Sequence, residues 1–430
     1  MRVWRRLDFD RDDSAPGGSS GATAPWREFQ GWMTSAAVDA ECERMRAEAT
    51  VQGGEADAEF AIDEAAALLG IAQWTSGRYL VLASTAAEVG SVGQHSVFGV
   101  SEVALVPLQW RQVAPKGVLS SMAQMLGLGT AQRAEGSFTA GIAAALSKPF
   151  ALFFSRGFDL TRPLQNQDPG PVSCPPREMF VWNHSLLEPL AGTVSPGWAT
   201  PVICGSFGQV SVSSFSKPMV LSLVSRRSRH FAGTRYFKRG VSRLGFVANE
   251  VELEQMVDDT AGGIASFVQL RGSVPLPWVQ RTSVRVPKPP ISMAPPDPTS
   301  LTGARQHFAS LLARHGAPIL CLNLLRKGSR AAREGPLGAS FADAVKTVNS
   351  TLPPALRLQF ASLDFASLSK SRSHHVLTAL RASSEWAVAN TGVFVAAPGK
   401  GGAAAGDGVG PVGLRTGHLA DEDALGEGFG

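Results

Sequence analysis

A change of rhythm near residue 200 constrains the fold of this chain more than any other feature of its sequence. Before it, short runs rich in β-branched and aromatic residues, such as 78–83 and 96–100, are separated by Gly and Ser turn signals. After it, apolar strands at 219–224 and 318–325 alternate with amphipathic helices. Strands that alternate with helices imply a sheet whose faces are covered. We therefore predict an α+β protein overall, with a β-rich first part and an α/β second part in which helices cover a mixed sheet.

The helices of the second part carry recognisable start and stop signals. Residues 305–315 carry one apolar face, and Gly316 is expected to end this helix. Ser340-Phe-Ala-Asp343 resembles a capping box, so a further helix is predicted to begin there and to end before Pro353.

Composition sets the predicted domain boundaries. Residues 1–58 are rich in Asp, Gly, Ser, Ala and Glu and are expected to be a mostly disordered lead-in. Residues 59–200 are predicted to form the β-rich domain and residues 201–396 the α/β domain. Residues 397–430, first Gly/Ala-rich and then acidic, are expected to be a disordered tail.

Several classes of protein are excluded by composition. At 44% hydrophobic, the chain can bury a sizeable core, but no window offers the roughly 18 apolar residues of a membrane-spanning helix. No apolar run follows the basic N-terminus, which argues against a secretory signal. The four cysteines lie far apart, without Cys-x-x-Cys, and favour a reducing cytosol over a disulfide framework or a zinc ribbon. No cofactor is predicted, because the Gly-rich match at 408–413 has neither a strand before it nor a helix after it.

A run of positive charge directly after the strand 219–224 is the candidate for chemistry. Its cations, with no acid among them, are Arg226, Arg227, Arg229, Arg235, Lys238, Arg239 and Arg243. Arginine's planar fork suits phosphate oxygens, and so many cations repel one another unless an anion offsets them. The acids at 250–259 offer the alternative of an internal salt-bridge network or a solvated face. The charge pattern leaves both interpretations open.

Longer blocks of sequence resemble the Sac-domain phosphoinositide phosphatases. Residues 225–255 resemble the signature block of that family, and residues 266–280 resemble the block that follows it. Upstream, Phe153-Phe-Ser-Arg-Gly-Phe-Asp-Leu-Thr-Arg-Pro-Leu-Gln165 is similar to its N-terminal subdomain. Downstream, Leu322-Asn-Leu-Leu-Arg-Lys-Gly328 also matches its pattern, so that the resemblance covers about residues 60 to 395.

The resemblance implies a β-rich Sac subdomain followed by an α/β catalytic subdomain, and hydrolysis of phosphate monoesters on inositol lipid head groups without a metal or cofactor. It implies phosphoinositide lipids and an anionic membrane surface as partners; a possible adaptor protein stays unknown. Nucleic acid is not expected as a partner, because no aromatic stacking run, zinc site or RNP-like motif accompanies the arginines. The expected location is cytoplasmic, peripheral on endomembranes. The residues that it assigns to substrate binding are Arg226, Arg229, Arg235, Lys238, Arg239 and Arg271.

Chemistry in this family depends on a Cys-x5-Arg loop, in which a thiolate attacks phosphorus while backbone N–H groups and the arginine hold the equatorial oxygens. None of the four cysteines is followed by an arginine six positions on; they are Cys42, Cys174, Cys204 and Cys321. Gly413-Leu-Arg-Thr416 resembles the approach to this loop, after which the similarity ends. The α/β subdomain is therefore expected to be incomplete, truncated before its nucleophile, and the chain as written inactive. Two origins stay open: an incomplete translation of an active phosphatase, and a catalytically dead phosphoinositide-binding module.

Overall fold

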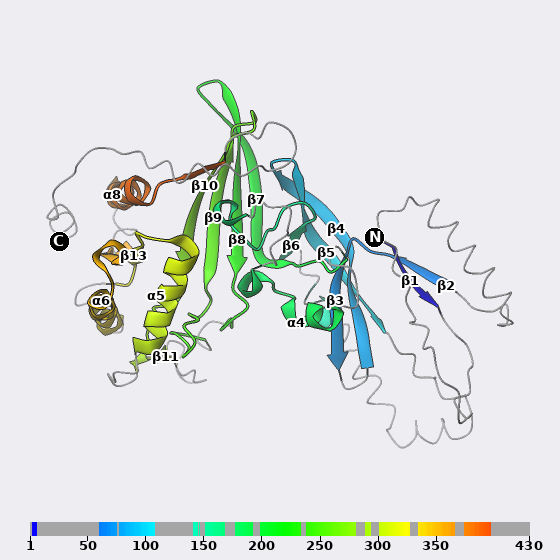
Figure 1. Ribbon diagram of the computed structural model, residues 1–430, viewed down its shortest axis with the longest axis horizontal. Coiled ribbons are helices and arrows are strands. Elements are labelled where there is room, and N and C mark those ends of the chain that lie inside the picture. Colours follow the sequence, from blue (N-terminus) through cyan, green and yellow to red (C-terminus); the bar gives the residue numbers. More distant parts are fainter. Residues whose placement is uncertain are drawn as a thin grey trace, which may run out of the picture. The chain divides into compact units, whose positions relative to one another are not determined.

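The computed structural model describes the chain in separate ranges, which divide into two compact units (Figure 1). The ranges are 2–6, 60–74, 77–107, 141–144, 146, 151–167, 177–191, 198–233, 238–280, 289–293, 301–326, 334–365 and 374–396. The first unit takes its described residues from 1–89, 97–156 and 183–202. The second takes them from 90–96, 157–182 and 203–430. The predicted segments 1–58 and 397–430 lie largely outside the described ranges.

The first unit is built from antiparallel strands. They are β1 (Arg2–Arg6), paired with β2 (Phe60–Glu64), then β3 (Ala67–Trp74), paired with β4 (Gly77–Val92), and β5 (His95–Pro107), paired with β6 (Leu152–Ser155). The short helices α4 (His184–Leu187) and η3 (Glu188–Leu190) pack their apolar side chains on Leu68, Leu80 and Leu82. The strands predicted at 78–83 and 96–100 are confirmed.

The second unit contains a run of antiparallel strands. In sheet order they are β7 (Ile203–Ser214), β8 (Lys217–Arg227), β9 (Val251–Asp258), β10 (Ile264–Arg271) and β15 (Phe394–Ala396). The loop of residues 228–250 separates β8 from β9. The turn between β7 and β8 places Phe215 and Ser216 at positive φ, as the tightest hairpin turns require. The short helices η1 (Leu164–Asn166) and η2 (Glu178–Phe180) belong to the same unit.

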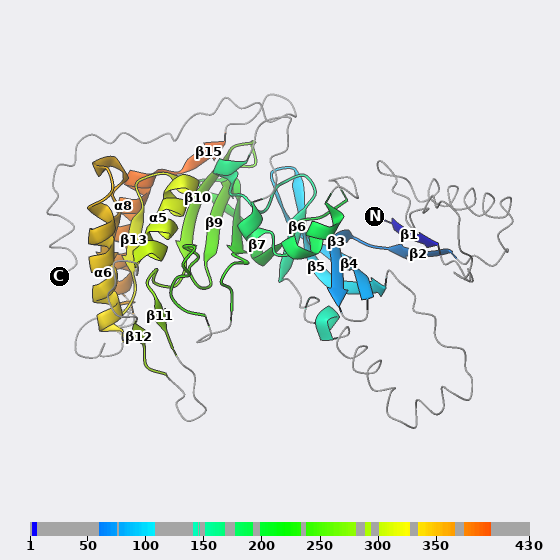
Figure 2. The same cartoon turned by 60° about the horizontal axis from the view of Figure 1, so that its bottom comes forward.

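Helices and strands alternate in the remainder of this unit, and Figure 2 shows the long helices grouped around β13. The elements are β11 (Trp278–Val279), β12 (Ser292–Met293), α5 (Thr302–His315), β13 (Leu320–Asn323), α6 (Gly335–Asn349), η6 (Pro354–Leu356), β14 (Gln359–Ser362) and α8 (His374–Thr391). Strands β13 and β14 are parallel, as expected for strands linked through a helix. Phe308, Leu337 and Phe341 form the centre of their shared core.

The α+β class is confirmed, with two corrections of detail. The alternation predicted from residue 201 begins only at α5, because the strands within residues 203–271 pair antiparallel with no helix between them. The helix predicted to begin at Ser340 begins at Gly335 instead. Pro336 lies in its first turn, where a fixed φ favours a helix and the missing N–H costs nothing. The end of α5 at Gly316, with φ of 76°, is as predicted. Among the described helices, none has the length and hydropathy that crossing a bilayer demands.

Candidate functional site

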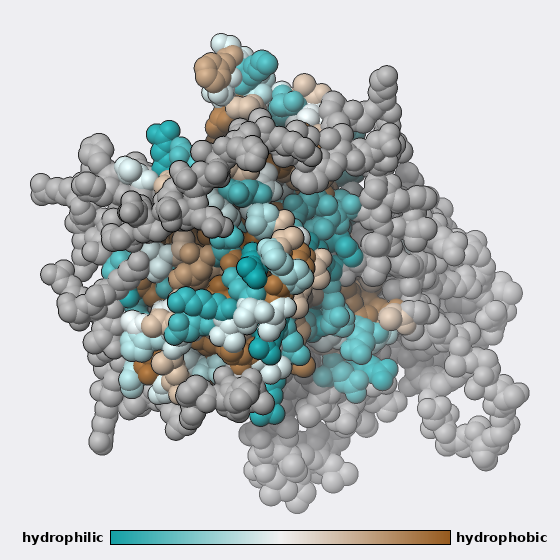
Figure 3. All heavy atoms as spheres, turned by 60° about the vertical axis from the view of Figure 1, so that its left-hand side comes forward, coloured by the Kyte–Doolittle hydropathy of each residue, from teal (hydrophilic) through white to brown (hydrophobic). Residues whose placement is uncertain are grey.

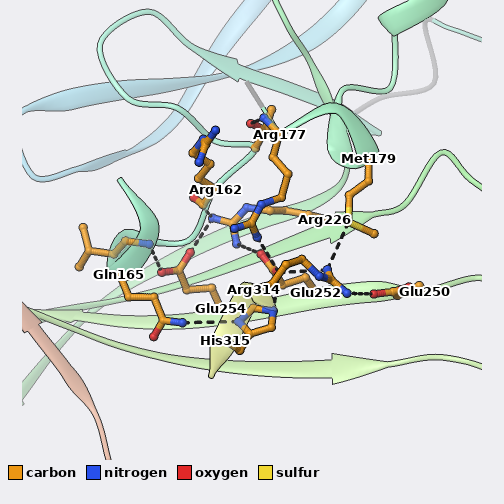
Figure 4. Close-up of polar contacts among 12 residues, drawn as sticks. Arg162, Gln165, Arg177, Met179, Arg226, Glu250, Glu252, Glu254, Arg314 and His315 are labelled. Atoms are coloured by element: carbon orange, nitrogen blue, oxygen red, sulfur yellow. Dashed lines mark hydrogen bonds and ion pairs between the residues drawn. The ribbon is translucent and has the colours of Figure 1, made fainter. Parts of the chain in front are cut away.

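A network of ion pairs fills the buried face of strands β8 and β9 (Figure 4). At its centre, the Arg226 guanidinium has no exposed surface, donates to Glu254 at 2.5 Å and lies 3.4 Å from Glu252. Its other N–H groups donate to the carbonyl oxygens of Leu160 and Arg162. Arg226 therefore ties β8 and β9 to the segment that leads into η1.

Further cations close the network from helix α5 and from the segment before η2. Arg177 lies 3.5 Å from the Glu252 carboxylate, and His315 lies 3.3 Å from it. Arg314 pairs with Glu250 at 2.6 Å. Because Arg314 and His315 are the last residues of α5, the network fixes the end of that helix on β9.

The charges of the network offset one another. Its arginines are Arg162, Arg177, Arg226 and Arg314, and its acids are Asp159, Glu250, Glu252 and Glu254. Buried charges are tolerated when they are paired and hydrogen-bonded, and Glu254 also accepts from the Ser266 hydroxyl at 2.6 Å. Glu250 and Glu252 thus pair mainly with cations from outside the basic run, whereas Glu254 pairs with Arg226.

Arg229, Lys238 and Arg239 belong to the basic run but lie outside this network, in the loop between β8 and β9. Arg229 is partly exposed, and its guanidinium pairs with Glu178. Lys238 is exposed, and Arg239 donates from Nε to Gln280 at 3.0 Å. These contacts hold the Arg229 and Arg239 side chains in place, and no carboxylate of the described residues pairs with Lys238.

Arg227 and Arg271 share one end and one face of the sheet. Both are paired in register with Val251, so their backbones are two strand spacings, about 10 Å, apart. Arg227 donates to Asn249 at 2.6 Å, whereas the Arg271 side chain is exposed. Arg235 lies outside the described residues.

Asp258 and Asp259, two of the acids that could have neutralised the basic run, lie at the other end of β9. Asp258 accepts the backbone N–H of Thr260, and Asp259 accepts those of Ala261 and Gly263. Strand β9 has eight residues, which places the two ends about 25 Å apart. At that separation these carboxylates are screened from the basic run.

The described cysteines have surroundings unlike those of a reactive thiolate. Burial raises the pKa of Cys321 to about 12, and burial also raises that of Cys204 against the opposing charge of Arg227. Cys42 and Cys174 lie outside the described residues. Within the described ranges, no three His, Cys, Asp or Glu side chains gather in a way that could hold a metal ion.

The free energy of unfolding is expected to decrease as the pH falls below about 6.5, because of His307. Burial lowers the pKa of this residue, against the opposing charge of Glu250. The unfolded chain then binds a proton that the folded chain does not, so the free energy of unfolding falls by at most about 1.4 kcal/mol per pH unit.

For Glu252, burial acts to raise the pKa, but the hydrogen bond from His315 and the charge of Arg226 lower it overall. Its contribution is therefore lost only at more acidic pH, as pH falls through its folded pKa.

Urea unfolding at pH values above and below about 6.5 measures this effect. The variant His307→Gln should flatten the slope of stability against pH, because it removes the group that titrates differently in the two states. An unchanged slope in His307→Gln would assign the acid sensitivity to other groups.

The structure divides the predicted substrate-binding residues. Arg226 is corrected: its guanidinium is enclosed and fully paired, so it holds the sheet together rather than facing a ligand. Sequence reasoning missed Arg177 and Arg314, which reach the network from distant segments. The sequence signal that could have indicated a charged network is the spacing of Glu250, Glu252 and Glu254, since residues at alternate positions of a strand share a face.

The sequence matches the SacI homology domain over residues 66–370. The chain is 34% identical over 336 residues to the Arabidopsis thaliana protein named phosphatidylinositol-3-phosphatase SAC1, covering 76% of this chain and 35% of that protein. It is 33% identical over 328 residues to the Schizosaccharomyces pombe polyphosphoinositide phosphatase, covering 72% and 37%. A Danio rerio protein, phosphatidylinositol-3-phosphatase SAC1-B, is 30% identical over 308 residues, covering 69% and 48%.

The family match identifies residues 66–370 as a SacI homology domain. The match covers well over half of the chain. The chain belongs to the Sac-domain phosphoinositide phosphatase family. It spans between about a third and a half of the length of the curated relatives named above.

Proposed function

We propose that this chain binds phosphoinositide head groups as part of a Sac-type phosphatase that hydrolyses their phosphate monoesters on the cytoplasmic face of endomembranes. The residues proposed to contact the head group are Arg229, Arg235, Lys238, Arg239 and Arg271. The names of the relatives support the lipid class, since these proteins are named as phosphatases of phosphatidylinositol 3-phosphate and of polyphosphoinositides.

One observation carries the proposal: two of the acids nearest the basic run, Glu250 and Glu252, already form ion pairs with cations from other segments. Glu250 pairs with Arg314, and Glu252 pairs with Arg177 and His315 as well as with Arg226. Neither of these two acids is therefore left to neutralise the loop. Arg229 pairs with Glu178, whereas the exposed Lys238 pairs with no carboxylate among the described residues. Arginine forks and lysine ammonium groups are the side chains that phosphate monoesters favour.

The alternative is a phosphoinositide-binding module without turnover. It is favoured by the sequence as written, because none of its cysteines has an arginine six positions on. A thiolate and its arginine cannot be replaced by positioning alone. We therefore expect the 430-residue chain to bind these lipids without releasing inorganic phosphate from them.

Vesicle binding tests the head-group assignment. The 430-residue chain is mixed with phosphatidylcholine vesicles that contain either a phosphatidylinositol monophosphate or phosphatidylserine at matched total charge. The expected result is stronger binding to the phosphoinositide, and Arg239→Ala should weaken that binding by about fivefold, the equivalent of about 1 kcal/mol per contact.

The matched control is Arg243→Ala, which removes the same charge from the same loop at an exposed position outside the assigned set. It should leave the ratio of binding to the two vesicle types unchanged. Equal binding of the unmodified chain to both vesicle types would refute the proposal.

A further inference from the structure

Polarity is inverted across the sheet formed by β7, β8, β9 and β10. Directly paired residues of an antiparallel ladder carry their side chains on the same face. The buried face therefore carries Ser222, Arg226, Glu252, Glu254 and Ser266, which are polar or charged and yet buried. Exposed apolar patches and buried polar groups are the informative exceptions to ordinary burial.

The opposite face, here called the open face, is mostly apolar and partly exposed, with Ser206, Ser225, Gln255 and Gln269 among its uncharged polar residues. Its main apolar side chains are Val210, Val212, Leu221, Leu223, Val257 and Phe267. Val210 is 52% exposed, Leu223 41% and Val212 40%. An antiparallel sheet with one solvated face normally places polar residues there, so this face has the composition of a contact surface.

Charge on the open face has one sign only. By the same register, the charged residues on this face of the four strands are Lys217, Arg227 and Arg271, and no acid lies among them. Lys217 lies at the β7–β8 turn, and at the other end of the sheet Arg227 ends β8 and Arg271 ends β10. Cations thus border the apolar strip at both ends.

The turn between β7 and β8 extends this surface. The pairing of β7 with β8 continues to Ser214 and Lys217, beyond the point where β9 ends at Asp258, and Figure 1 shows this turn rising above the neighbouring strands. Phe215 is 98% exposed at its tip. In Figure 3 the coloured atoms at the top of the view, where this turn lies, include hydrophobic ones beside hydrophilic ones.

We propose that the open face docks on an anionic lipid bilayer, with its apolar strip against the interface and Lys217, Arg227 and Arg271 among the head groups. An apolar surface bordered only by cations complements a negatively charged membrane, each cation contributing about fivefold in affinity. The proposal deepens the proposed function, since a face bound flat on the membrane brings the loop after β8 to the lipid head groups.

The test places acids on each face of the same strands. The double variant Val210→Glu with Leu223→Glu adds two negative charges to the open face at exposed positions. Ser211→Glu with Ser213→Glu adds the same charge at exposed positions that point to the other side. Vesicles of phosphatidylcholine with phosphatidylserine are the probe, in a flotation assay.

The first double variant should bind these vesicles at least about tenfold more weakly, and the second should bind within about twofold of the unmodified chain. The preference for a phosphoinositide over phosphatidylserine should stay unchanged in both, which separates this surface from the head-group site. Equal losses in the two double variants would overturn the proposal. So would sedimentation of the unmodified chain as a dimer that the first double variant dissociates, since the occupant would then be a second copy.

Discussion

Arg226→Met is expected to lower the free energy of unfolding by about 3–5 kcal/mol, because removal of one partner leaves buried charges without compensation. Glu252 and Glu254 have no exposed side-chain surface, and both lose the guanidinium between them. The carbonyl oxygens of Leu160 and Arg162 lose their donor at the same time. Such a loss is a large fraction of the roughly 5–15 kcal/mol that stabilises a typical domain. Urea unfolding, followed by circular dichroism, measures it.

Two further variants keep this prediction testable if Arg226→Met fails to fold. Arg271→Met removes an arginine from an exposed position of the same sheet and should change stability by no more than about 0.5 kcal/mol. Adding Glu254→Gln to Arg226→Met removes one stranded charge, while the amide oxygen can still accept from Leu164 and Ser266 as the carboxylate does. The double variant should therefore be more stable than Arg226→Met. If it is less stable, the ion pair does not explain the loss.

The elements that sequence reasoning predicted are those with local signals. Helix α5 has an apolar face and a glycine at its end, and the segment 219–224 is strongly apolar, so both were predicted at nearly their true positions. The start of α6 was misplaced because Ser340 offered a capping pattern inside a helix that Pro336 begins one turn earlier. The antiparallel strands within 203–271 were mistaken for alternation with helices because a strand that buries charged residues lacks the usual pattern.

The candidate site was predicted only in part for a similar reason. Nearness in sequence suggested that the acids after residue 250 neutralise the basic run before it. In the fold, strand register opposes only Arg226 to Glu252, and Arg177 and Arg314 come from segments more than sixty residues away from these acids. Ion pairs between distant segments produce no periodic pattern in a single sequence, so the partners of a charged residue can be identified only once the topology of the fold is known.

Gly240→Ala should lower the free energy of unfolding by about 2–4 kcal/mol, the sum of a left-handed backbone and a steric clash. Gly240 has φ of 73°, and a Cβ at this position would lie 2.4 Å from the Leu276 carbonyl oxygen and 2.9 Å from the Trp278 amide nitrogen. Neither backbone atom can rotate away as a side chain can. Gly208→Ala is the matched control, since a Cβ there meets nothing within 4 Å, and it should be neutral or slightly stabilising.

This substitution also connects stability to the proposed site. The backbone N–H of Gly240 donates to the Ser273 hydroxyl, and its carbonyl accepts from Ala248, so the glycine anchors the loop directly after Lys238 and Arg239. A shift of this anchor moves both cations relative to the sheet. Gly240→Ala should therefore lose the preference for phosphoinositide over phosphatidylserine vesicles at temperatures where it is still folded, whereas Gly208→Ala should keep it. Retention of the preference in a folded, destabilised Gly240→Ala chain would mean that the head group is held by other residues.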